Sequence, residues 1–169
     1  MTPLITGNYI SFAAACFTLA SALSGDRKRI YLFQAVQCFL LAVANIFFFS
    51  VSGVTTFLLC AVRNLLLACD RFTRKLCIVF VAAVAVIGLA ANNRGLLGLL
   101  PVITTALYTI ICLYAKREKA IKMNMVVNLS LWAVYEIFIS DYVSFAVDSA
   151  TAAAALFSIF RKQNVRRHL

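Results

Sequence analysis

The chain has 169 residues, of which 63% are hydrophobic and only 13% charged, and its mean hydropathy is +0.93. A soluble domain of this length cannot hide so much apolar surface from water, so the composition predicts a membrane protein. The net charge of +10 gives no reason to expect a nucleic-acid partner, because the basic residues are grouped in short segments between apolar runs.

Long stretches of the chain carry no charge. The stretch 30–62 would form a helix about 50 Å long against a hydrocarbon core about 30 Å thick, so we divide it at "SVSG", residues 50–53. Membrane strands would alternate apolar and polar residues, which these runs do not, so the fold class is all-α. The seven expected membrane spans are residues 4–24, 30–49, 54–69, 76–92, 96–115, 123–140 and 142–160.

The first span is expected to be retained, since no basic segment precedes it as in a signal peptide. Fourteen of the sixteen basic residues fall on one face of this arrangement, in "GDRKR", "DRFTRK", "KREKAIK" and the tail "RKQNVRRHL". The opposite face has only Arg94, and the remaining basic residue, Arg63, lies inside the third span. The positive-inside rule therefore predicts an N-terminus outside and a C-terminus in the cytoplasm.

The two halves of the chain come into register when the sequence is shifted by 91 positions. "AVANIF", residues 42–47, then falls on "AVYEIF", residues 133–138, and Gln37 falls on Asn128. Three spans cross the membrane an odd number of times, so an extra span between two copies makes the copies parallel. We expect a first repeat at 1–75, a linker helix at 76–94 and a second repeat at 95–169. The alternative is seven helices with a chance similarity.

One arginine lies in the middle of an apolar span. Arg63, in "TTFLLCAVRNLLLAC", is about ten residues from the outer end of its expected span, where a charge costs roughly 2.5–3.5 kcal/mol on insertion scales. It therefore needs a partner, water or a solute. Asp148 lies about 6 Å further outward by helical rise, and we expect the two side chains to pair across the repeats. The pair is either a gate or solute-binding group, or a salt bridge that fixes helix register.

Amides form a second group of candidate residues. Gln34, Gln37 and Asn45 share one face of the second span, and Asn128 and Glu136 repeat the spacing of the last two on the sixth. Together they predict a polar stripe that runs inward from an acidic outer vestibule with Glu136, Asp148 and Asp141. The stripe either lines a solute path or supplies interhelical hydrogen bonds worth about 0.6–2 kcal/mol per contact.

Other features allow two interpretations. Pro101, in "GLLPVITT", either frees backbone carbonyls for a ligand or hinge, or only bends its helix. Trp132 lies deeper than an interfacial aromatic belt and is a candidate to stack on a solute. The six cysteines have no metal or redox spacing, and His168, the only histidine, is interpreted as a structural tail residue. No metal-ligand set, nucleophile with a base or glycine-rich phosphate loop is present, so neither an enzyme nor a cofactor is expected.

The motifs "CAVRNLLL" around Arg63 and "GLLPVITT" around Pro101, with Asp148 in the seventh span, resemble the YgjV-type bacterial inner membrane proteins. The three-plus-one-plus-three order resembles the wider SWEET and PQ-loop transporter superfamily. The resemblance implies an inner-membrane location and a carrier-like fold. The proline-glutamine pair of that superfamily is Pro101-Val102 here and the first span has no matching proline, so sugar binding is not implied.

The leading hypothesis is a small-solute carrier that works by alternating access, with Arg63 and Asp148 as a switchable pair. Its expected partners are a small-molecule solute, the lipid bilayer with anionic lipid at the cytoplasmic face, and a second copy of the chain in a homo-oligomer. The alternative is a membrane scaffold or sensor subunit that transports nothing and whose buried charges only hold helices together. A water-accessible cavity that reaches Arg63 favours the carrier.

Overall fold

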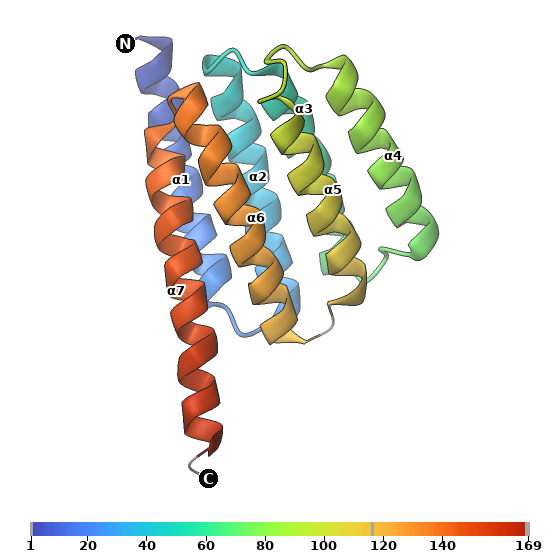
Figure 1. The fold of residues 1–169 in the computed structure, drawn as a ribbon, viewed down its shortest axis with the longest axis vertical. Coiled ribbons are helices and arrows are strands. Elements are labelled where there is room, and N and C mark those ends of the chain that lie inside the picture. The colour runs from blue at the N-terminus through green and yellow to red at the C-terminus, as the bar shows by residue number, and fades with distance from the viewer. Residues whose placement is uncertain (1, 116, 168–169) are drawn as a thin grey trace.

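The computed structural model describes residues 2–115 and 117–167, and within them the chain forms seven α-helices and no strands (Figure 1). His168 and Lys116 lie outside the described residues. The helices are α1 (Pro3–Leu23), α2 (Arg27–Phe47), α3 (Val51–Ala68), α4 (Arg74–Ala90), α5 (Leu99–Tyr114), α6 (Glu118–Ile139) and α7 (Tyr142–Arg167).

The all-α prediction is confirmed, and each expected span matches one helix. By length and composition, α1, α2 and α3 are apolar enough to cross a membrane, and Leu99–Tyr114 and Tyr142–Phe157 are shorter apolar helices. The largest difference at a helix start is five residues, at α6, and the starts of α2, α3 and α5 differ by three. The third helix begins early because the Ser50 side chain accepts a hydrogen bond from the Gly53 amide at 3.1 Å, which caps its first turn.

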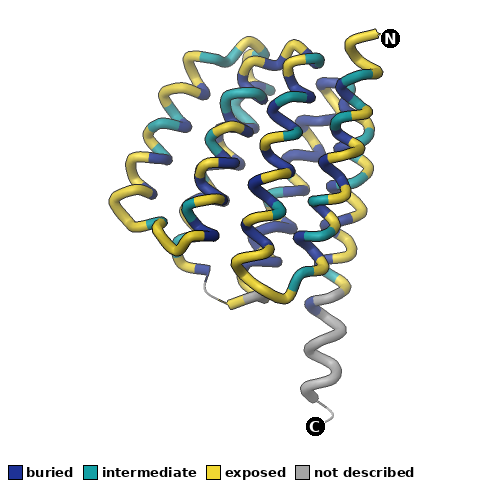
Figure 2. Tube along the Cα trace, turned by 180° about the vertical axis from the view of Figure 1, so that it is seen from behind, coloured by how far each residue is buried: buried dark blue, intermediate teal, exposed yellow. Residues whose placement is uncertain are grey.

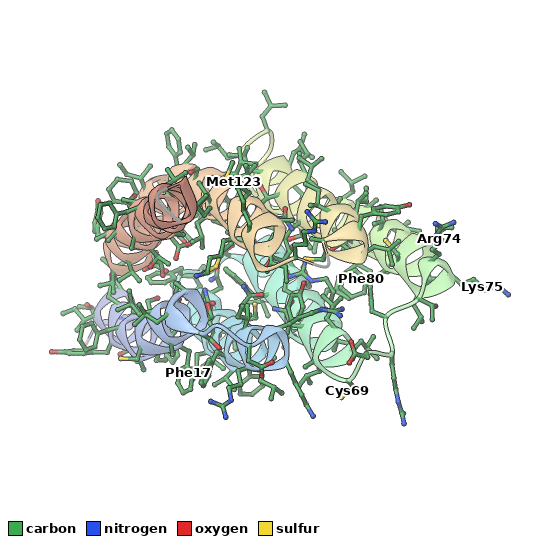
Figure 3. The ribbon with its side chains drawn as sticks, turned by 90° about the horizontal axis from the view of Figure 1, so that it is seen from below. Phe17, Cys69, Arg74, Lys75, Phe80 and Met123 are labelled. Atoms are coloured by element: carbon green, nitrogen blue, oxygen red, sulfur yellow. The ribbon has the colours of Figure 1, made fainter. Side chains whose placement is uncertain are left out.

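The helices stand in two rows (Figure 3). In one row α2 packs between α1 and α3, and in the other α6 packs between α5 and α7. The rows meet at both ends, where α1 contacts α7 and α3 contacts α5. The remaining helix, α4, packs on α5 and α3 and is at the edge of the bundle in Figure 1. Six helices therefore surround a central space, and α4 lies outside them.

Polarity is distributed as in a membrane bundle. Buried residues face the interior between the rows and exposed residues face outward (Figure 2). Large apolar side chains lie on the outer surface, including Tyr9, Phe12, Ile78 and Phe138, each more than half exposed. A contiguous apolar surface of this kind is what a lipid environment covers. The turns α1–α2, α3–α4 and α5–α6 all lie at the end of the bundle toward which α7 runs (Figure 1).

Two turns at the opposite end have the same hydrogen bonds at positions 91 residues apart. The Ser50 amide donates to the Asn45 carbonyl at 3.0 Å, and the Asp141 amide donates to the Glu136 carbonyl at 3.0 Å. The residue before each is left-handed, Phe49 with a φ of 52° and Ser140 with a φ of 64°. The α2–α3 and α6–α7 turns therefore have the same backbone geometry, although their sequences differ.

Candidate functional site

A cavity of about 30 Å³ lies between the two helix rows. This volume holds two or three water molecules, at roughly 10–15 Å³ each on this measure. Five helices supply its walls, and Arg63 and Asp148 are both among the lining residues. The lining residues are Gln34, Gln37, Cys38 and Leu41 of α2, Phe57, Cys60, Arg63 and Asn64 of α3, Tyr108 of α5, Met125, Asn128, Leu129 and Trp132 of α6, and Asp148 of α7.

Arg63 is held in the cavity wall by neutral groups. Its Nε and one terminal nitrogen donate to Asn64 Oδ1 at 3.1 and 3.0 Å, and the other terminal nitrogen donates to Thr109 Oγ1 at 3.0 Å. The guanidinium also lies over the Tyr108 ring, 4.6 Å from its centroid. The side chain is only 3% exposed. A buried cation is thus oriented by hydrogen bonds without a neutralising anion beside it.

The expected direct pair between Arg63 and Asp148 is not formed. In the described part of the chain, the ion pairs are Arg27 with Asp70 and Arg29 with Asp26, both near helix ends. Because α3 begins at Val51 and not at residue 54, Arg63 is twelve residues into its helix, whereas Asp148 is six residues into α7. The offset in depth is therefore about 9 Å and not 6 Å. Asn64 and Thr109 are closer acceptors, and the arginine bonds to them.

Asp148 faces the same cavity from the opposite row. It is 4% exposed, and no hydrogen bond from another described residue reaches its carboxylate. The cavity therefore has a guanidinium in one wall and a carboxylate in another, with space between them. Two buried opposite charges that do not touch keep their desolvation cost without gaining a direct contact.

The amide stripe is only partly at the cavity. Gln34, Gln37 and Asn128 line it, and Gln34 accepts a hydrogen bond from the Tyr108 hydroxyl at 3.0 Å, which joins α2 to α5. Asn45 does not line it: its amide nitrogen donates to the Leu41 carbonyl of its own helix at 2.9 Å. The polar stripe thus contributes three amides to the cavity, and its outer end is buried between helices.

Glu136 is also sealed away from the cavity. It is 2% exposed, and neither carboxylate oxygen has a hydrogen-bond partner among the described residues. Asp148 and Asp141 lie close enough to interact with it electrostatically. The expected acidic group is therefore present, but as a buried cluster toward the α6–α7 turn and not as an open vestibule.

Asp141 has partners that Glu136 lacks. Its carboxylate accepts hydrogen bonds from Ser11 Oγ at 2.9 Å and from the Ser144 amide at 3.0 Å, so it caps α7 and joins it to α1. Burial raises the pKa of Asp141 above its ordinary value, and these hydrogen bonds from Ser144 and Ser11 offset part of that rise. Hydrogen bonds thus offset the cost of burying Asp141, whereas none offsets the cost of burying Glu136.

Replacing each of these acids by leucine is expected to give opposite signs of stability change. Glu136→Leu should raise the free energy of unfolding by about 1–3 kcal/mol, because it removes a buried polar group without partners. Asp141→Leu should lower it by about 1–2 kcal/mol, because it removes a helix cap. The measurement is reversible denaturation of both variants in the same detergent. A loss of stability in Glu136→Leu equal to that in Asp141→Leu would contradict this assignment.

Stacked aromatic side chains form part of the cavity wall. Trp132 is stacked on Phe57 with centroids 4.3 Å apart, and Tyr135 packs edge-on against Trp132 at 5.7 Å. Trp132 is therefore in the cavity wall, as the stacking hypothesis requires, but its present partner is a side chain. Pro101 is buried in the first turn of α5 and does not line the cavity.

Three residues that hold the Arg63 guanidinium were given no role by the sequence interpretation. Asn64, Tyr108 and Thr109 make all the contacts of the Arg63 guanidinium described above. Asn64 is next to Arg63 in "VRNL", a polar dipeptide in an apolar helix that could have been identified. The other two could not, because a tyrosine and a threonine in "LYTI" are common in membrane helices and only the packing of α5 on α3 brings them to Arg63.

No group of three or more His, Cys, Asp or Glu side chains that could hold a metal ion occurs in the described ranges. The model of the family Imp-YgjV, described as bacterial inner membrane protein, matches residues 5–166. No curated protein and no solved structure matches the chain. The match covers nearly the whole chain and all seven helices begin or end within it, so the protein belongs to the Imp-YgjV family and is a multi-pass protein of the bacterial inner membrane.

Proposed function

We propose that the protein is a small-solute carrier that works by alternating access, with the central cavity as its solute site. The observation that carries the proposal is this cavity, which lies between two helix rows and is lined by Arg63 and Asp148. Buried ionisable residues that face a cavity inside a membrane protein mark solute or ion pathways. A scaffold gains nothing from two buried charges that are held apart.

The two rows correspond to two parallel three-helix repeats, with α4 as the linker. The matching turns at Ser50 and Asp141 support this division, because the 91-residue shift found in the sequence relates them. The packing order supports it too: α1 on α7 is the counterpart of α3 on α5. The first unit is then residues 1–75, the linker 76–94 and the second unit 95–169. Rocking of one unit against the other opens the cavity alternately to each side.

The N-terminus is outside and the C-terminus is in the cytoplasm. Support comes from the positions of the turns: the three that carry the basic segments lie at one end of the bundle, with the C-terminal end of α7 (Figure 1). Arg94 is at the other end, where it donates to the Phe48 carbonyl at 3.0 Å. The basic end can also bind anionic lipid of the inner leaflet.

The structure corresponds to a contracted state of the carrier. At the outer end the rows are joined by a hydrogen bond between the Ser50 and Tyr135 hydroxyls at 2.6 Å and by one from Ser11 to Asp141 at 2.9 Å. The stacked pair of Phe57 and Trp132 lies just inside them. A cavity that holds two or three waters must widen before a solute enters. When these contacts break and the rows move apart, the cavity opens to the outside.

Native cysteines allow a direct test. Cys38 and Cys60 line the cavity, whereas Cys16 is exposed on the outer surface of α1. A protein that keeps only Cys38 and Cys60 should react with a charged, membrane-impermeant thiosulfonate reagent added to either side of the membrane, because each half-cycle opens the cavity to one side. Labelling is measured by mass spectrometry in right-side-out and inverted vesicles.

The matched control keeps only Cys16, which faces lipid and should not react with the charged reagent from either side. In a static scaffold the cavity stays sealed, so a failure of Cys38 and Cys60 to react from both sides would exclude alternating access. Reaction from one side only would indicate a fixed, one-sided pocket and would also count against the carrier.

A further inference from the structure

The two charged residues of the cavity define the charge of the solute it fits. Arg63 of α3 and Asp148 of α7 are the arginine and the carboxylic acid of its wall, and both are more than nine-tenths buried. Arg63 is held by Asn64 and Thr109, which are neutral, and the Asp148 carboxylate has no hydrogen bond from any other described residue. Each charge is thus positioned at the cavity and lacks an opposite charge in contact with it.

Other charge classes of solute fit this wall poorly. An anion would be attracted by Arg63 and repelled by Asp148, whereas a cation would be attracted by Asp148 and repelled by Arg63. Both effects are large, because charges in a site of low dielectric interact strongly. A neutral sugar would leave both charges without a counter-charge. A molecule with one carboxylate and one ammonium group can bind both residues. Each charge in the cavity wall then has an opposite charge in contact with it.

The cavity favours a compact molecule, because its volume of about 30 Å³ must widen before any solute enters. By helical rise the Cα atoms of the two residues differ in depth by about 9 Å, so the carboxylate and the ammonium group bind at different depths. The wall between them offers the neutral amides of Gln37 and Asn128 and the ring of Trp132. These groups can bind the polar backbone and the side chain of a small amino acid.

We infer that the solute is a zwitterion of the α-amino acid class, bound with its carboxylate at Arg63 and its ammonium group at Asp148. This inference rests on the proposed carrier function. Small apolar side chains are favoured over charged ones, because apolar residues such as Trp132, Phe57 and Leu129 also line the cavity.

The test uses the purified full chain in lipid nanodiscs and a panel of the twenty L-α-amino acids. For each amino acid, the matched α-hydroxy acid lacks the ammonium group and the matched decarboxylated amine lacks the carboxylate. At least one amino acid is expected to raise the thermal midpoint in a concentration-dependent way, and its two matched compounds should bind at least 10-fold more weakly. No shift with any amino acid, or equal binding of a hydroxy acid or an amine, overturns the inference.

Variants assign the two ends of the solute. In Asp148→Asn the amino acid and its hydroxy acid should bind equally, because the ammonium group no longer has a counter-charge. In Arg63→Gln the amino acid and its decarboxylated amine should bind equally, because the carboxylate no longer has a counter-charge. If Arg63→Gln does not fold, the Asn64→Asp variant, which places a competing carboxylate at Arg63, gives the same comparison. The assignment is contradicted if Asp148→Asn still binds the amino acid more tightly than its hydroxy acid and the variant at Arg63 or Asn64 still binds the amino acid more tightly than its amine.

Uptake into proteoliposomes separates this inference from the proposed function. An amino acid that binds with the expected charge dependence but is not transported would uphold the zwitterion site and overturn the carrier. Transport of an anion or a neutral sugar, with no binding of amino acids, would uphold the carrier and overturn the zwitterion site.

Discussion

Changing Asn64 to aspartate is expected to leave the protein folded and to weaken solute binding by roughly 10- to 100-fold. Asn64 Oδ1 accepts two hydrogen bonds from Arg63, at 3.1 and 3.0 Å. An aspartate keeps these acceptors and places a negative charge in contact with Arg63, so it competes with an incoming carboxylate. A hydrogen bond to a charged group is worth about 1.5–3 kcal/mol, which is the source of the expected factor.

The matched control is Asn64→Leu, which has a similar volume and no acceptor. It leaves two guanidinium donors buried without partners and should lower the free energy of unfolding by about 1.5–3 kcal/mol. Stability is measured by denaturant titration in one detergent, and binding by the concentration dependence of the thermal midpoint.

A structural role for Arg63 makes the opposite prediction for binding. If the arginine only fixes the position of α3, Asn64→Asp strengthens its attachment and leaves solute uptake as in the wild type. Full uptake by a stable Asn64→Asp protein would therefore show that Arg63 does not contact the solute.

The sequence predicts the helices of this protein better than the contacts between their polar residues. Apolar runs and the breaks at "SVSG" and "GDRKR" locate all seven helices, because crossing a bilayer imposes a length that can be counted. The depth of Arg63 depends on a cap, since the Ser50 side chain moves the start of α3 by one turn. That shift is enough to separate Arg63 from Asp148 and to leave it with Asn64 and Thr109.

Helix packing also decides which residues of the polar stripe line the cavity. Gln37 and Asn45 share a helix face, yet Gln37 lines the cavity and Asn45 packs against the first turn of α3. Periodicity gives the face of a residue but not which neighbouring helix covers it. Glu136, which the 91-residue shift places at the position of Asn45, is buried in the same way at the other turn.

Close packing of α2 on α3 at this turn depends on the absence of a side chain at Gly53. A methyl group there would overlap Asn45 Oδ1 and lie 2.7 Å from Ser50 Oγ, and Ser50 joins the two helix rows through Tyr135. Gly53→Ala is therefore expected to lower the free energy of unfolding by about 1–3 kcal/mol, the usual cost of overpacking. The helix propensity of alanine would by itself act in the opposite direction, by roughly 1 kcal/mol. Denaturant titration measures the net effect.

Gly25→Ala is the matched control, because a methyl group at Gly25 meets no atom within 4 Å. Its effect should stay within about 0.5 kcal/mol. The collision is tested by adding Asn45→Ala, which removes the overlapping oxygen: the double variant should be more stable than the sum of the two single effects predicts. If Gly53→Ala is as stable as the control, the turn has room to relax. The hydrogen bond between Ser50 and Tyr135 would then not depend on close contact between α2 and α3.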